Sequence, residues 1–195
     1  MAKKTNNTKS KIVKAAWKLF YEQGYDDTTV DEIIAESGTS KGSFYHYFDG
    51  KDALLSSLSY MFDEKYTELR ETLDDGMNSF DKLLYMNQVL FGMIDSEINI
   101  DLLARLYSSQ LTAKSQKHML DYNREYYKLL RKVVSEGQER GEISREMSVN
   151  DIVNFYAMCE RGIMYDWCIH NGEYSLQGYA KEVMPIFLSK LKAQM

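Results

Sequence analysis

Cysteine and proline are scarce in this chain of 195 residues, which holds two cysteines and one proline. Cys159 and Cys168 stand nine positions apart in a segment of helical periodicity, where a rise of ~1.5 Å per residue would separate their backbones by about 13 Å. A disulfide requires Cα atoms within about 7 Å, so we expect two free thiols. No cysteines or histidines have the spacing of a zinc site, and we predict neither a metal nor a cofactor.

Long apolar runs are also missing from the sequence. No segment approaches the ~20 apolar residues of a membrane-spanning helix, and the first residues lead into no apolar signal-peptide core. Motifs of phosphate-binding loops, dinucleotide folds, zinc proteases and serine hydrolases are absent as well. We therefore expect a cytoplasmic protein that has no membrane partner and is not an enzyme.

Acidic residues are absent from the first 20 positions, which carry six lysines. From residue 52 onward, 22 acidic residues outnumber 16 basic ones, and the whole chain has a net charge of -5. The distribution of charge matters more for nucleic-acid binding than the sum, because phosphates respond to the local field. The sequence thus predicts a basic end attached to an acidic body.

Apolar residues recur at helical spacing along most of the chain, and the alternation typical of strands is nearly missing. We therefore predict an all-α fold of about nine helices, with an N-terminal three-helix head that contains a helix-turn-helix and a larger C-terminal helical body. Beyond the head, we predict helices at about residues 51–73, 79–94, 99–111, 115–137, 148–171 and 175–193.

Capping signals mark the short helices of the head. Gly24 ends the first helix. Thr29 can cap the second, where Glu32 would complete a capping box, and this helix ends at Gly38. Ser40 can cap a third helix, in which Phe44 and Phe48 should face the core of the head with Ile33 and Leu54. Two short helices joined by a glycine turn are the supersecondary unit of many DNA-binding proteins.

Residues 8–54 carry a dense set of matches to one family. The matching residues are Ile12, Ala15-Ala16, Leu19-Phe20, Gly24-Tyr25, Thr28-Thr29-Val30, Ile33, Gly38, the run from Ser40 to Phe48, and Lys51-Asp52-Ala53-Leu54. This segment resembles the DNA-binding head of the TetR/AcrR family of bacterial regulators. It departs from the usual pattern at Ile34, where alanine is commoner, and at Thr39, where an aliphatic residue is expected. The resemblance implies a DNA-binding domain at residues 6–66, with its helix-turn-helix at about 29–48, and a regulatory, ligand-binding and dimerisation domain at 67–195.

A helix that enters the major groove needs small or polar residues at its N-terminal end, and the run from Thr39 to Ser43 supplies them. In the family, the residues that match Tyr45 and Lys51 hold backbone phosphates, which fixes the register of the protein on DNA. The start of the second helix is also placed for a phosphate. The predicted DNA contacts are Thr29, Thr39, Ser40, Lys41, Gly42, Ser43, Tyr45, His46 and Lys51.

Eleven methionines and fifteen tyrosines suggest a cavity for apolar or aromatic molecules, because thioethers are flexible and tyrosine rings are amphipathic. The family commonly binds an inducer in its C-terminal helices, which implies a small apolar or aromatic effector here. The alternative is that most of these side chains form ordinary core. The candidate pocket residues are Tyr85, Met86, Phe91, Met93, Leu103, Tyr107, Met119, Tyr122, Tyr126 and Leu130.

Each of the last two predicted helices carries an apolar stripe. In TetR-type proteins these two helices pair across a two-fold axis in a four-helix bundle, which implies a homodimer here, although either stripe can instead face the core of its own subunit. Pro185 should kink or thin the final helix. The candidate interface residues are Tyr156, Ile163, Trp167, Val183, Phe187 and Leu191.

Together these features predict a ligand-responsive repressor that binds a palindromic operator as a homodimer. A two-fold dimer presents two recognition helices about 34–36 Å apart, the spacing of consecutive major grooves. The sequence leaves open an effector-independent DNA-binding dimer and a helical protein-interaction module that has lost DNA binding. It also does not separate repression from activation.

Overall fold

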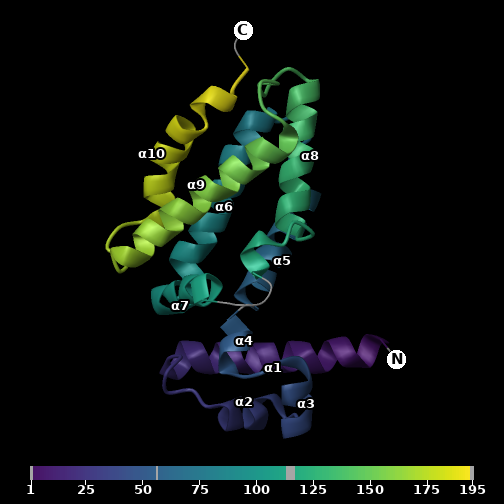
Figure 1. The fold of residues 1–195 in the computed structure, drawn as a ribbon, viewed down its shortest axis with the longest axis vertical. Coiled ribbons are helices and arrows are strands. Elements are labelled where there is room, and N and C mark those ends of the chain that lie inside the picture. Colours follow the sequence, from purple (N-terminus) through teal and green to yellow (C-terminus); the bar gives the residue numbers. More distant parts are fainter. Residues whose placement is uncertain (1, 56, 113–116, 194–195) are drawn as a thin grey trace. The chain divides into compact units, whose positions relative to one another are not determined.

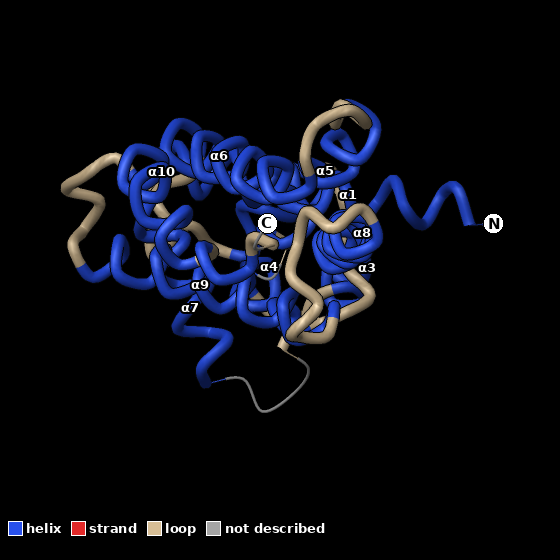
Figure 2. The backbone as a smooth tube through the Cα atoms, turned by 90° about the horizontal axis from the view of Figure 1, so that it is seen from above, coloured by secondary structure: helices blue, strands red, loops and turns tan. Residues whose placement is uncertain are grey.

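The computed structural model describes the backbone of residues 2–55, 57–112 and 117–193 (Figure 1). Within these ranges every named element is helical (Figure 2). One isolated antiparallel bridge joins Ile143 to Lys192. The predicted all-α fold is confirmed. The chain divides into two compact units, Met1–Tyr60 with Asp101–His118, and Met61–Ile100 with Met119–Met195.

The N-terminal unit contains four helices at the start of the chain: α1 (Ala2–Gln23), α2 (Val30–Ser37), α3 (Lys41–Tyr47) and α4 (Lys51–Leu55). Phe44 and Phe48 lie in its core with Ile33 and Leu54, as predicted. The core also contains Leu102, which lies on α7 (Ile100–Thr112) and is 3% exposed. The N-terminal unit therefore includes residues 101–118, which lie far beyond the predicted DNA-binding domain at 6–66. The sequence prediction instead divided the chain into two uninterrupted segments, 6–66 and 67–195.

Local hydrogen bonds explain why α2 and α3 form where the sequence predicts them. Glu32 N donates to Thr29 Oγ1 at 3.2 Å and Thr29 N donates to Glu32 Oε2 at 2.7 Å, which completes the capping box. Gly38 ends α2 with a φ of 62°, a left-handed conformation that glycine adopts without steric cost. Ser43 N then donates to Ser40 Oγ at 3.1 Å, which caps α3. The predicted caps are confirmed.

The prediction of a single helix at 51–73 is wrong, because the structure has two helices there, α4 and then α5 (Leu58–Thr72). The break comes at Ser57, whose N–H donates to Leu54 O at 2.9 Å and whose hydroxyl bonds to the same carbonyl. Serine side chains compete in this way with the regular helical ladder. Trp17 Nε1 also donates to Ser57 Oγ at 2.8 Å and so fixes the serine at the break.

The prediction of a helix at 115–137 is also wrong for the first part of that segment. Residues 115 and 116 lie outside the described residues, and the segment then forms the 3-10 turn η1 (His118–Leu120) before α8 (Glu125–Glu139). Asn123 N donates to Asp121 Oδ1 at 3.0 Å and Arg124 N donates to Asp121 O at 3.2 Å. This aspartate-centred turn separates the two elements.

The C-terminal unit is built on α5, α6 (Ser79–Glu97), α8, α9 (Val149–Ile169) and α10 (Leu176–Phe187). Helix α6 packs against α8 and α10, and α9 packs against the same two helices. Helix α10 ends two residues after Pro185, which lacks the N–H for the helical ladder, and the turn η2 (Ser189–Leu191) follows. In the described part of the chain, no helix is long and apolar enough to cross a membrane.

Both cysteines lie on α9 and are free, as predicted. Burial raises the pKa of each thiol to about 11. The thiols are therefore protonated at neutral pH, the form of cysteine that is a poor nucleophile.

Candidate nucleic-acid interface

The N-terminal end of α3 is an open surface made of small and polar residues. Ser40, Lys41 and Gly42 are exposed, and Thr39 and Ser43 are half-buried. A Cβ atom placed on Gly42 would meet no atom closer than Ser40 Oγ at 3.9 Å, so no side chain of the described residues covers this part of the backbone. Another molecule can therefore approach the first turn of the helix closely, as base reading in the major groove requires.

The opposite face of α3 is anchored in the core. Phe44 is fully buried, and its ring centroid lies 5.9 Å from that of Phe48 and 5.3 Å from that of Tyr45, the latter in an edge-to-face arrangement. Tyr45 itself is 47% exposed, and His46 is exposed next to it. The structure thus brings seven of the nine predicted DNA-contact residues, those from Thr39 to His46, together on one short segment of surface.

Thr29, at the start of α2, is exposed but is engaged within the chain. Its hydroxyl donates to Glu32 Oε2 at 2.8 Å while it accepts from Glu32 N. The hydrogen bonds from Thr29 hold the pKa of the Glu32 carboxyl below its ordinary value. The glutamate is therefore ionised at the N-terminus of α2, where a DNA phosphate would have to share the helix end with it.

Lys51 is also engaged within the chain. Its ammonium donates to three backbone carbonyls of the α1–α2 loop, to Tyr25 O at 2.6 Å, Thr28 O at 2.8 Å and Asp26 O at 3.2 Å. The same ammonium lies over the ring of Tyr25, 4.4 Å from its centroid. An ammonium has three protons to donate, so Lys51 ties this loop to α4. Sequence reasoning missed this role because its partners are 23 to 26 residues away.

Arg105 of α7 holds the same loop from another element. Its guanidinium lies over the ring of Tyr25, 4.9 Å from the centroid, and donates to Asp26 Oδ2 at 2.6 Å. Asp101 accepts from Arg105 Nε at 2.8 Å and so orients the side chain. Tyr25 OH donates to Asp52, and burial raises the pKa of this phenol well above its ordinary value. The loop that leads into the helix-turn-helix is thus held by two cations.

Replacing Lys51 with methionine tests its structural role. Lys51→Met is expected to lower the free energy of unfolding by about 1–3 kcal/mol, because hydrogen bonds from a charged donor are removed. Lys41→Met is the matched control, since the ion pair of Lys41 with Asp31 is exposed and spans 3.4 Å; its effect should stay below about 0.5 kcal/mol. Urea unfolding followed by circular dichroism measures both. Equal stability of Lys51→Met and wild type would refute the role.

A cavity of about 40 Å³ lies in the C-terminal unit. It has room for about three water molecules. Two of the predicted pocket residues, Met119 and Tyr126, line it. The others do not: Met86, Phe91 and Leu130 are fully buried, Met93 is half-buried, Tyr85 and Tyr122 are about half exposed, and Leu103 and Tyr107 belong to the N-terminal unit. The full lining is Phe62, Tyr66, Leu90, Met119, Arg124, Tyr126, Ala157, Glu160, Arg161 and Met164.

Glu160 is the lining residue that the sequence could have revealed. It stands on the apolar stripe of α9, four residues after Tyr156 and three before Ile163, and it is 2% exposed. Its carboxyl accepts from Asn87 Nδ2 at 2.9 Å and from Tyr126 OH at 2.8 Å. Burial raises the pKa of this carboxyl, and the hydrogen bonds from Asn87 and Tyr126 oppose the rise.

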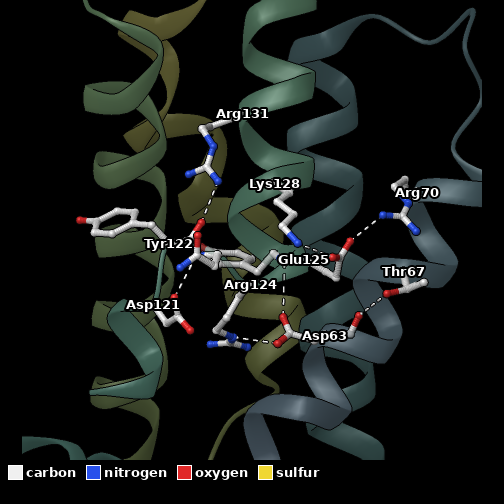
Figure 3. A network of polar contacts seen from close by, with 11 residues as sticks. Asp63, Thr67, Arg70, Asp121, Tyr122, Arg124, Glu125, Lys128 and Arg131 are labelled. Atoms are coloured by element: carbon white, nitrogen blue, oxygen red, sulfur yellow. Dashed lines mark hydrogen bonds and ion pairs between the residues drawn. The ribbon is translucent and has the colours of Figure 1, made fainter. Parts of the chain in front are cut away.

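Arg124 is fixed in the cavity wall by a network that Figure 3 shows between α5 and α8. Its Nε donates to Asp63 Oδ2 at 2.9 Å, and both side chains are largely buried. Tyr126 N donates to the other oxygen of Asp63 at 3.4 Å. Beside this pair, Glu125 accepts from Arg70 and Lys128. The charge of Arg124 is thus neutralised inside the protein.

Four of the six candidate interface residues are buried within the chain: Tyr156, Ile163, Trp167 and Leu191. Tyr156 OH donates to Leu83 O and Trp167 Nε1 donates to Tyr174 O, so these rings face the subunit core, the alternative that the sequence left open. Val183 is half-buried and Phe187 is 44% exposed.

A different face of α9 and α10 is apolar and exposed, and sequence periodicity did not separate it from the buried one. Six large side chains on these two helices are at least 43% exposed: Met158, Tyr165, Ile169, Tyr179, Ile186 and Phe187. A groove of about 290 Å³ runs along it, lined by Met158, Cys159, Gly162, Ile163, Asp166, Tyr179 and Phe187. We call this face the α9–α10 surface.

Comparison with known proteins finds a matching family profile for each of the two parts of the chain. A family profile described as "Bacterial regulatory proteins, tetR family" matches residues 12–58. A second profile, described as "YsiA-like protein, C-terminal region", matches residues 61–190.

Three relatives come from Bacillus subtilis (strain 168). The HTH-type transcriptional regulator YuxN is 48% identical over 59 residues, which are 30% of this chain. The HTH-type transcriptional regulator YerO is 24% identical over 190 residues, which are 95% of this chain. The chain spans only 20% of YuxN and 64% of YerO. The fatty acid metabolism regulator protein is 22% identical over 182 residues, which are 91% of this chain and 92% of that protein.

The fold is also that of a solved structure. That structure is the crystal structure of the transcriptional regulator FadR from Bacillus subtilis in complex with stearoyl-CoA. The match covers 93% of this chain and 98% of the FadR chain, with a TM-score of 0.68 and 22% sequence identity. Since the C-terminal profile alone matches more than half of the chain and the tetR profile matches its head, the chain belongs to the TetR family of bacterial regulatory proteins.

Proposed function

We propose that the protein is a ligand-responsive repressor that binds a palindromic operator as a homodimer. The observation that carries the proposal is the open N-terminal end of α3, where Ser40, Lys41 and Gly42 are exposed above a side chain, Phe44, that is locked in the core. A rigid helix with an uncovered, small-residue end fits the major groove. Tyr45 and His46 extend the same surface along the helix.

The α9–α10 surface supports the dimer. Exposed apolar side chains grouped on one face mark an interaction surface, since water disfavours them. A two-fold axis through this surface would pair α9 and α10 of one subunit with the same helices of its partner, an isologous interface. Of the interface residues predicted from the sequence, this proposal keeps Phe187, which lines the groove and is 44% exposed; Ile163 also lines the groove but is buried within the subunit.

The cavity in the C-terminal unit supports a ligand. Its wall carries flexible methionine side chains, Met119 and Met164, which can move aside for a larger molecule. A long-chain acyl thioester is the first class to test, because the FadR structure that shares this fold holds stearoyl-CoA. A cavity of about 40 Å³ is too small for such a molecule as it stands. The ligand would therefore favour an expanded state, and it can alter DNA binding only to the extent that it prefers that state.

Operator selection from a random duplex pool tests the proposal. The full-length protein should enrich a palindrome with half-sites one helical turn apart, and that palindrome placed over a promoter should lower expression of a reporter when the protein is present. Stearoyl-CoA should release the protein from the selected DNA. If the selection enriches no sequence, the proposal that the protein reads DNA is refuted. If the protein instead raises expression of the reporter, only the proposal of repression is refuted. DNA affinity that no ligand changes would leave an effector-independent binder.

A further inference from the structure

An unpartnered hydroxyl lies in the wall of the C-terminal cavity. Tyr66, on α5, is 1% exposed and lines the cavity, yet no hydrogen-bond partner for its OH is found among the residues that the structure describes. Its ring packs against that of Tyr126 at a centroid distance of 4.9 Å. A buried hydroxyl without a partner lowers the stability of the protein, unless another molecule supplies the missing hydrogen bond.

A hydrogen-bond acceptor lies in the same wall. The two carboxyl oxygens of Glu160 accept from Asn87 Nδ2 and Tyr126 OH, and the hydroxyl of Tyr156 is within hydrogen-bonding reach of the same carboxyl. A carboxylate has about four acceptor sites, so Glu160 can accept a further hydrogen bond. Tyr66 offers a donor and Glu160 an acceptor to the same small space. These are the two partners that one aliphatic hydroxyl requires.

The charges around the cavity are balanced. Arg124 is paired with Asp63 at 2.9 Å, and Arg161, whose Nη1 donates to Tyr127 OH at 3.3 Å, interacts electrostatically with Glu160. An anionic or cationic ligand would therefore lose its hydration without gaining an opposite charge that is free of other partners. An uncharged polar group avoids this cost.

We infer that the cavity recognises an uncharged hydroxyl group on an otherwise apolar ligand, the hydroxyl accepting from Tyr66 OH and donating to Glu160. The apolar part of the ligand lies against Phe62, Leu90 and Met164. This inference rests on the proposed ligand-responsive function and specifies the chemistry of the group that enters the cavity. An unsubstituted acyl chain, such as that of stearoyl-CoA, can occupy the same cavity but leaves this donor and acceptor without a partner, so a hydroxyl adds affinity.

Four small probes of similar length distinguish the possible head groups: 1-octanol, its isomer 1-methoxyheptane, octanoate and octylammonium. The ether can accept from Tyr66 but cannot donate to Glu160, and the last two probes carry a charge. Calorimetric titration of the full-length protein is expected to show that octanol binds about tenfold more tightly than each of the other three, the size of effect of one buried hydrogen bond left unmade.

Tyr66→Phe removes the donor and keeps the ring. It should weaken octanol binding about fivefold or more, while the thermal midpoint stays the same or rises, because an unsatisfied hydroxyl has been removed. Tyr174→Phe is the matched control. Its hydroxyl donates to Asp166 Oδ2 at 2.9 Å, and neither residue lines the cavity, so this variant should leave the affinity and the preference for octanol unchanged.

Equal affinity for octanol and the ether, tighter binding of either ion, absence of binding by all four probes, or an unchanged octanol affinity in Tyr66→Phe would each overturn the inference. Operator binding and its release by stearoyl-CoA are measured on the same preparation. If these remain while the octanol preference is absent, the hydroxyl inference fails alone; if DNA binding itself is absent, the proposed function fails.

Discussion

A Lys41→Ala, Tyr45→Ala double variant is expected to bind the operator at least roughly 1000-fold more weakly than the wild-type protein, with little change in its stability to urea. Each side chain that holds a base edge or a phosphate contributes about 1–3 kcal/mol, and a dimer carries two copies of each. Stability should hold because Lys41 is 67% exposed at its side chain and Tyr45 is 47% exposed. Fluorescence anisotropy measures the affinity, and the log–log salt slope should fall by about 0.9 for each DNA phosphate that the variant no longer binds.

The matched control replaces the same residue types away from α3. Lys132 on α8 and Tyr85 on α6 are both exposed, so a Lys132→Ala, Tyr85→Ala variant loses the same charge and the same ring. It should bind the operator like the wild type. If both double variants lose affinity equally, the loss reflects charge or folding rather than the surface of α3, and the assignment of the DNA-binding residues is wrong.

The second large effect concerns the α9–α10 surface. A Met158→Glu, Phe187→Glu variant is expected to be monomeric and to bind the operator more than about 100-fold more weakly. Both side chains line the groove and are exposed, Met158 by 56% and Phe187 by 44%, so carboxylates there should not disturb the fold of the monomer. In a two-fold interface each carboxylate would be desolvated and repeated by symmetry, which strongly disfavours association.

Sedimentation velocity measures the mass of this variant, and circular dichroism confirms that it is folded. Leu111→Glu, Met147→Glu is the control, since both residues are exposed apolar side chains, 71% and 41%, outside the α9–α10 surface. The control should remain a dimer and bind DNA. If the Met158→Glu, Phe187→Glu variant remains dimeric and retains operator affinity, the dimer interface lies on another face of the protein.

The head could be predicted from the sequence because its determinants are local. The capping box joins residues three apart, Gly38 is needed at one left-handed position, and Phe44 and Phe48 share one helix face. Each of these signals is complete within a few positions of the chain. The helix breaks at Ser57 and Asp121 were missed because a side chain that bonds to the nearby backbone there outweighs an apolar pattern that continues across the break.

The C-terminal sites could not be predicted as well, because apolar side chains look alike in a core, a cavity wall and an interface. Helix α9 is apolar on more than one face, so periodicity did not distinguish buried Trp167 from exposed Ile169. The cavity depends on hydrogen bonds between distant segments, such as that of Asn87 with Glu160, 73 positions apart. Only the charge of Glu160 within an apolar stripe pointed to a polar site.

The most direct test is an anisotropy titration of the selected palindrome and of a scrambled duplex of the same composition, at about 0.1 and 0.2 M salt. We predict saturation at two chains per palindrome, an affinity roughly a thousandfold above that for the scrambled duplex, and weaker binding to both at the higher salt. Equal affinity for the two duplexes, or saturation at one chain, would contradict the account of a dimer that reads DNA through α3.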